Sequence, residues 1–191
     1  MPPNKRPPEP WDSFLKDLDV AVSETTRMDC IGGFVVAQFY GLGRPTADVD
    51  VIEIAPRKAA DTIMAIGLRG SPLSRRHGIY LDRVGIAAIP EDYEDRLVEM
   101  FPDAYQHLRL MAVDPYDLAL SKLERNGQKD RDDVRFLARS VPLDLDILKR
   151  RYEKELRWQL GVPQREDLTL KLWLEMIQED RANSPTSQKH L

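Results

Sequence analysis

The sequence has few of the residues that build disulfides and zinc sites. Its 191 residues include one cysteine, Cys30, and three histidines. A single cysteine excludes an internal disulfide and suits a reducing compartment, so the composition predicts a cytoplasmic protein. The histidines are scattered and no cysteine cluster accompanies them, which argues against zinc. Because Cys30 lies in an apolar run, we expect a buried thiol there rather than a nucleophile.

Long apolar runs and an excess of positive charge are also absent. No segment approaches the roughly 20 apolar residues of a membrane span, and the polar start, MPPNKRPPEP, lacks the apolar core of a signal peptide. The formal net charge is −4, whereas general nucleic-acid binders are basic. We therefore expect no membrane contact, and contact with nucleic acid only through a local patch.

The chain length and the apolar patterning predict one domain with a helical extension. The expected parts, in chain order, are a disordered proline-rich arm, an α+β domain, a helical C-terminal extension and a disordered tail. They correspond to residues 1–10, 11–139, 140–180 and 181–191.

Apolar periodicity and turn residues predict a small mixed β-sheet flanked by helices, which is an α+β fold with a helical C-terminal part. Strands are expected around Met28, Asp48 and Asp82 and at 108–112. Helices are expected at 11–25, 34–40, 57–66, 91–100, from Pro115, and at 129–139, 145–160 and 168–177. The residues between the third helix and the Asp82 strand are expected to form a basic loop with Arg69, Arg75, Arg76 and His77.

Two aspartates, Asp48 and Asp50, lie in a run of Val and Ile that predicts a strand. Alternate side chains leave the same face of a strand, so both carboxylates would project together. Such a pair can hold Mg²⁺ against the phosphates of a nucleotide. The alternative is a pair of solvated carboxylates at the entrance of a strand. The same spacing recurs only in stretches typical of helices or loops, namely Asp17/Asp19, Asp92/Glu94, Asp130/Asp132, Asp144/Asp146 and Glu153/Glu155.

A glycine pair, Gly32 and Gly33, precedes this strand and is followed by a short apolar segment. Glycines let the backbone approach a ligand closely, and the start of a helix favours an anion. The alternative is a plain strand–turn–helix connection. Arg44 and Thr46 stand just before the strand. Arg44 either binds a phosphate bidentately or anchors the turn, and we expect Thr46 to hydrogen-bond the backbone of the turn.

The stretch GGFVVAQFYGLGRPTADVDVIEI resembles the first motif of the minimal nucleotidyltransferases of the DNA polymerase β superfamily. Within that superfamily it is most similar to the bacterial AbiEii-like and DUF6036-type proteins. A second block, VDPYDLALSKLERNGQKDRDDVRFLAR, resembles their helical signature at Pro115, Asp117, Leu118, Lys122, Leu123, Lys129, Asp130 and Asp133. The resemblance covers residues 29–139 and implies a nucleotidyltransferase-like fold.

The resemblance also implies roles for individual residues. A third carboxylate is expected on the next strand, where Asp82 is the candidate; otherwise Asp82 is a solvent-facing strand residue. Asp48, Asp50 and Asp82 would then hold Mg²⁺, or Mn²⁺ in its place, and Asp82 would draw the proton from the attacking hydroxyl. The glycine pair would cradle the phosphates.

Lys122 matches a family lysine that contacts nucleotide phosphates. Judged from its helix-like surroundings alone, it is a solvated lysine with a buried stem. Lys129, Asp130 and Asp133 either orient the site or pair with one another on an exposed helix, and for Asp133 we favour the structural role.

The function implied by the resemblance is a metal-dependent nucleotidyltransferase, and a component of a toxin–antitoxin system with a cognate partner protein. It would move a nucleoside monophosphate from an NTP to a protein or to RNA, tRNA included, and the basic loop would meet an RNA acceptor. One alternative is a catalytically silent, nucleotide-binding or antitoxin-type interaction protein of the same fold. Another is an enzyme that modifies a small molecule. The intact glycine pair and both acids favour the first function.

Overall fold

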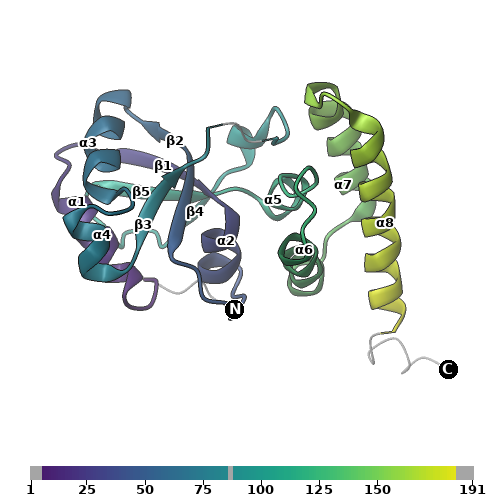
Figure 1. Cartoon of the computed structure of the whole chain (residues 1–191), viewed down its shortest axis with the longest axis horizontal. Helices are drawn as coiled ribbons and strands as arrows, with labels where there is room; N and C mark the ends of the chain where they lie inside the picture. The colour runs from purple at the N-terminus through teal and green to yellow at the C-terminus, as the bar shows by residue number, and fades with distance from the viewer. Residues whose placement is uncertain (1–5, 86–87, 184–191) are drawn as a thin grey trace. The chain divides into compact units, whose positions relative to one another are not determined.

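The computed structural model describes residues 6–85 and 88–183 (Figure 1). It confirms the predicted α+β class. The chain forms two compact units, the first containing residues 6–85 and 93–114 and the second containing residues 88–92 and 115–183. Disorder is expected for residues 1–10 and 181–191; residues 1–5 and 184–191 of these segments lie outside the described residues, and Arg181 and Ala182 belong to a helix. The domain boundary expected after residue 139 stays a prediction.

The first unit is built on a five-stranded mixed sheet with the strand order β3-β2-β1-β5-β4. Neighbouring strands are antiparallel in the pairs β1–β2 and β4–β5, and parallel in the pairs β1–β5 and β2–β3. The strands are β1 (Thr26–Ile31), β2 (Asp48–Ala55), β3 (Tyr80–Arg83), β4 (Val98–Met100) and β5 (Leu108–Ala112).

Helices α1 (Trp11–Val20), α3 (Arg57–Gly67) and α4 (Pro72–His77) cover one face of this sheet (Figure 1). Apolar strand residues such as Cys30, Val49 and Leu81 are buried on this side with Phe14 and Ile63 of the helices. Because side chains alternate along a strand, the residues between them project from the other face. That second face carries most of the sheet's charged side chains: Arg27, Asp29, Asp48, Asp50, Glu53, Asp82 and Arg109.

A short helical segment joins β1 to the loop before β2. Its first turn is α2 (Gly32–Phe34), which continues as a π-helical turn, Val35–Phe39. This agrees with the helix expected at 34–40, and the glycine pair forms its start.

Two predictions for the first unit are wrong. The helix expected at 91–100 is a 3₁₀ turn, Tyr93–Arg96, followed by β4, because pairing with β5 overrides the local preference of the acidic segment. The basic loop expected before Asp82 contains α4, which includes Arg75, Arg76 and His77. The sequence carried the signals for this helix: Ser71 caps it, Pro72 begins it, and Gly78 ends it in the left-handed conformation.

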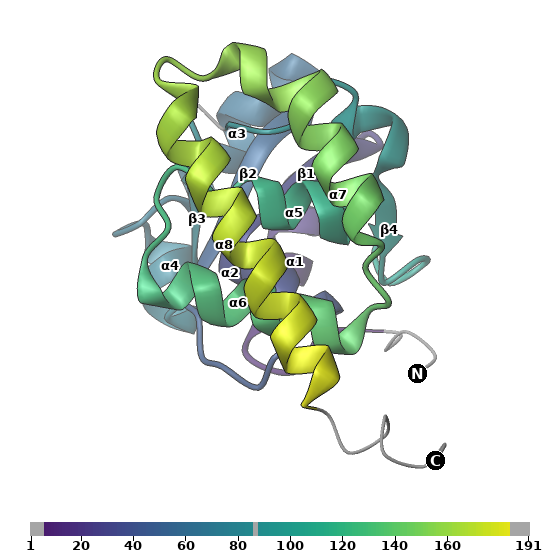
Figure 2. The same ribbon diagram turned by 90° about the vertical axis from the view of Figure 1, so that its right-hand side faces the viewer.

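The second unit is helical, as expected for the C-terminal part. Its helices, shown in Figure 2, are α5 (Pro115–Leu120), α6 (Gln128–Ser140), α7 (Leu145–Arg151) and α8 (Pro163–Ala182). The helix expected at 145–160 ends as α-helix at Arg151 and continues as π and 3₁₀ turns. The core of this unit includes Leu148, Leu156 and Trp173. None of the described helices has the length and hydrophobicity needed to cross a bilayer.

Asp19 joins the end of α1 to the start of β5. Its carboxylate accepts backbone N–H bonds from Gln106 at 2.9 Å, His107 at 2.7 Å and Leu108 at 2.8 Å. Burial alone would raise the pKa of Asp19, but the three donors to the charged form outweigh it and hold the pKa below its ordinary value. The charged form of Asp19 therefore stabilises the fold.

We expect Asp19→Ala to lower the free energy of unfolding at pH 7 by about 2–3 kcal/mol, because three N–H groups lose a charged acceptor. Since the folded-state pKa lies below the unfolded value of about 3.9, this contribution is full above that pH and is lost as the pH falls through the folded-state pKa. Urea unfolding of the wild type and of Asp19→Ala between pH 7 and pH 3 measures this difference in unfolding free energy. Asp61→Ala, which removes an exposed carboxylate of α3, is the control. If the difference in unfolding free energy between the wild type and Asp19→Ala did not change with pH, the role of the charge would be contradicted.

Candidate functional site

The three predicted acids share one face of the sheet. Asp48 and Asp50 stand on either side of buried Val49 at the start of β2, so their side chains both point away from the helix-covered face. Strand β3 runs parallel to β2 with Asp82 as the register partner of Asp50. Register partners project to the same side, and neighbouring strands lie about 4.8 Å apart. The sheet therefore brings the three carboxylates to one side of two adjacent strands.

Asp50 packs directly against the glycine pair. Gly32 has a φ of +73°, and a Cβ at this position would overlap Oδ2 of Asp50. Both the backbone conformation and the close approach therefore require glycine here. The carboxylate of Asp50 occupies the space that a side chain would fill.

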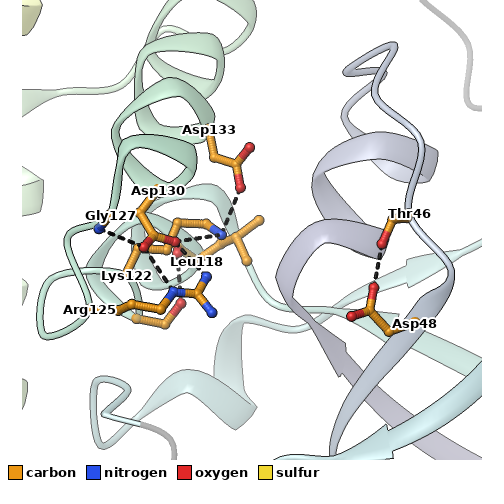
Figure 3. A network of polar contacts seen from close by, with 9 residues as sticks. Thr46, Asp48, Leu118, Lys122, Arg125, Gly127, Asp130 and Asp133 are labelled. Carbon is orange, nitrogen blue, oxygen red and sulfur yellow. Dashed lines mark hydrogen bonds and ion pairs between the residues drawn. The ribbon is translucent and has the colours of Figure 1, made fainter. Parts of the chain in front are cut away.

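Two further predicted residues lie over Gly33. A Cβ on Gly33 would be 3.3 Å from Nη2 of Arg44 and 3.3 Å from Oγ1 of Thr46. The Thr46 hydroxyl donates to Oδ1 of Asp48 at 2.5 Å (Figure 3). Thr46 thus positions a carboxylate of the site, whereas the sequence suggested a bond to the backbone of the turn. Together these contacts join both glycines, Arg44 and Thr46 to the acids of β2.

The same face of the sheet holds an acid that the sequence analysis missed. Asp29 of β1 is fully buried and forms an ion pair with Arg27, with 3.0 Å between Nε and Oδ1. Nη2 of Arg27 also lies 3.2 Å from Oε2 of Glu94. Burial is the main cause that raises the pKa of Asp29 to about 6, although Arg27 opposes it. The alternation of Arg27 and Asp29 within an apolar strand was the available signal.

Lys122 belongs to the second unit and is buried there, with 3% of its side chain exposed. Its Nζ lies 2.9 Å from Oδ2 of Asp133 and 3.9 Å from Oδ1 of Asp130 (Figure 3). Asp130 also accepts two bonds from Arg125, at 2.8 and 2.5 Å, and one from the Gly127 N–H at 2.9 Å. This network holds the start of α6 against the segment before it.

The burial of this network corrects two expectations. Asp130 and Asp133 are each 1% exposed, so they do not lie on an exposed helix face as one interpretation had them. Lys122 is not a solvated lysine either, because both its stem and its amino group are buried. Burial would raise the pKa of Asp130, but the bonds from Arg125 and Gly127 outweigh it and lower the pKa. The contact of Lys122 with nucleotide phosphates stays a prediction.

The described residues contain no group of three or more His, Cys, Asp or Glu side chains arranged closely enough to hold a metal ion. Asp48, Asp50 and Asp82 share a face, but their carboxylates do not converge as such a group. Their role as metal ligands therefore stays a prediction.

A family model described as "Nucleotidyltransferase of unknown function (DUF6036)" matches residues 13–181. The match includes every residue expected in the site. No curated protein matches the chain, and no solved structure does either.

We expect Gly32→Ala to destabilise the protein by about 1–3 kcal/mol more than Gly41→Ala. Both positions have positive φ, but a Cβ at Gly41 meets nothing within 4 Å, whereas at Gly32 it displaces the Asp50 carboxylate. Urea unfolding of the two variants isolates the effect of the contact from that of the backbone. Equal losses would show that Asp50 does not constrain Gly32.

We expect Lys122→Met to lower the free energy of unfolding by about 3–5 kcal/mol, because it removes the lysine from a buried ion pair. Lys129→Met, on the exposed side of α6, is the matched control and should change stability by less than about 0.5 kcal/mol. Chemical denaturation measures both. Similar stabilities for the two variants would contradict a structural role for Lys122.

Proposed function

The chain belongs to the DUF6036 family of nucleotidyltransferases of unknown function, and from this premise we propose a specific reaction for it. In this proposal the protein moves a nucleoside monophosphate from an NTP to an acceptor, with Mg²⁺ or Mn²⁺ as the cofactor. The single observation that carries the proposal is the shared face of Asp48, Asp50 and Asp82 beside the glycine pair.

The side chains on this face have the chemistry that a divalent cation binds. Carboxylate oxygens are the ligands that Mg²⁺ and Mn²⁺ prefer, and two of the three acids are held in place by the fold. Asp50 rests against Gly32, and Asp48 accepts the bond from Thr46. Asp48, Asp50 and Asp82 would hold the ion, which when bound would neutralise the triphosphate and align its α-phosphate.

The remaining groups of the site position the reactants. The backbone at Gly32 and Gly33 would approach the phosphates, and the Arg44 guanidinium, which lies beside Gly33, would bind their oxygens. Asp82 is exposed on β3 and would accept the proton of the attacking hydroxyl. The hydroxyl oxygen bonds to the α-phosphorus, the bond from that phosphorus to the bridging oxygen breaks, and pyrophosphate leaves. Positioning and charge compensation supply most of the catalysis in such transfers.

Lys122 is retained in this proposal as a phosphate ligand on the strength of the family resemblance. Its ion pair with Asp133 gives it a structural role as well. A loss of NTP affinity in Lys122→Arg without a loss of unfolding free energy would support the phosphate contact, because arginine keeps the charge but not the shape of the lysine cation.

We propose an RNA, such as a tRNA, or a protein as the acceptor, a cytoplasmic location, and a place in a toxin–antitoxin system. These parts rest on the resemblance and on the composition, which includes a single cysteine. The silent interaction protein of the same fold is the alternative that the transfer assay decides.

We expect the purified protein to transfer label from at least one α-labelled NTP to a macromolecule in cell extract when Mg²⁺ or Mn²⁺ is present. Asp48→Asn combined with Asp50→Asn should reduce the rate by about 100-fold or more, because both proposed metal ligands lose their charge. Asn keeps the size of each side chain, so the melting temperature should change little.

Asp61→Asn, on the helix-covered side of the sheet, serves as the matched control and should retain the full rate. EDTA should stop the transfer. Full metal-dependent transfer by the double variant would refute the assignment of the acids, and no transfer with any NTP or metal would favour the silent interaction protein.

A further inference from the structure

An aromatic side chain lies next to the proposed catalytic acids. Tyr80 is the register partner of Asp48 in the parallel pair of β3 and β2. It therefore projects from the same face as Asp48, one strand away, and stands two residues before Asp82. Since β3 is an outer strand of the sheet and Tyr80 is half-buried, part of its side chain remains accessible.

Arg69 lies next to Tyr80, beyond the edge of the sheet, and extends the row formed by Asp48 and Tyr80. Leu68 forms a parallel bridge with Leu81, so the chain before α4 runs alongside β3. Leu81 points to the helix-covered side, and alternation therefore directs Arg69, which follows Leu68, to the side of Tyr80. The Arg69 guanidinium carbon lies 4.1 Å from the centroid of the Tyr80 ring, and its Nη2 donates to the Tyr80 hydroxyl. Arg69 itself is exposed.

The row Arg69, Tyr80, Asp48 thus places a guanidinium plane and an aromatic ring beside a carboxylate. Stacked aromatic and guanidinium planes are the surfaces on which unpaired nucleic-acid bases stack, and the arginine charge binds phosphate. The other basic residues before β3 belong to α4, on the helix-covered side: Arg75 is exposed there, and Arg76 and His77 contact Asp17, at 3.2 and 2.9 Å.

The Arg69 guanidinium places positive charge beside the Tyr80 ring, although the net charge of the protein is −4. Arg83, the register partner of buried Val51, projects from the opposite side of β3. Positive charge beside an aromatic plane complements a single-stranded polyanion better than it complements a basic or neutral protein segment.

We propose that Tyr80 and Arg69 form the acceptor subsite, which binds a single-stranded nucleic acid and places its end beside Asp48. The role of this subsite in transfer rests on the proposed function. Binding of the nucleic acid can be measured without NTP, metal or catalysis, so the subsite and the proposed function can fail separately.

The test is fluorescence anisotropy with a labelled single-stranded RNA oligonucleotide in EDTA, without NTP. Tyr80→Leu should weaken binding by roughly 10- to 100-fold, because it removes a stacking ring, and Tyr80→Phe, which keeps the ring, should bind as wild type does. Arg69→Gln should weaken binding and lower the slope of log K against log salt by about 0.7. Arg57→Gln, which removes an exposed arginine at the start of α3, should have little effect. All variants should keep the wild-type melting temperature within a few degrees.

A double-stranded RNA probe should bind more weakly than the single strand, because its bases are not free to stack. The inference is overturned if no variant changes binding of the single strand, if Arg57→Gln weakens it as much as Arg69→Gln does, or if no oligonucleotide binds. It is also overturned if Tyr80→Leu alters only the affinity for free NTP, since the ring would then serve the incoming nucleotide. Binding that depends on Tyr80 without any transfer would support the subsite and refute the proposed function.

Discussion

The parallel register of β2 and β3 is the constraint on which the whole site depends. It places Asp82 opposite Asp50 and Tyr80 opposite Asp48, so these four side chains project from one face. If either strand shifted by one residue, its own polar side chains would move to the apolar face under the helices. Buried Val49 and Leu81, which alternate with the acids, fix this register because they must stay in the core.

The close contact between Gly32 and Asp50 adds a second constraint at the same place. The strand β1 ends where the glycine pair begins, and the backbone turns there with a positive φ. Because no side chain separates the backbone from the carboxylate, the turn and the acid must keep their positions together. Thr46 acts similarly on Asp48. The groups proposed to bind phosphate and metal are therefore held by short local contacts within one unit.

Local patterns predicted much of this fold. The run of Val and Ile around Asp50 identified β2, and the order of the glycines, Arg44 and Thr46 identified their grouping around it. The edge strand β4 could not be predicted, because Val98–Met100 becomes a strand only through its pairing with β5. The burial of Lys122 could not be predicted, because in sequence it resembles a lysine whose stem is buried and whose amino group is solvated. The structure places it in the turn after α5, with Asp133 beside it. The stack of Arg69 on Tyr80 likewise depends on the bridge between Leu68 and Leu81, which joins segments without a common motif.

The central claim is that Asp48, Asp50 and Asp82 hold one divalent-cation site. A crystal structure with Mn²⁺ and a non-hydrolysable NTP, recorded at the manganese absorption edge, tests it most directly. The account predicts anomalous density within about 2.3 Å of carboxylate oxygens from the three aspartates, with the triphosphate beside Gly32 and Gly33. Manganese bound elsewhere, with these three side chains directed to solvent, would contradict it.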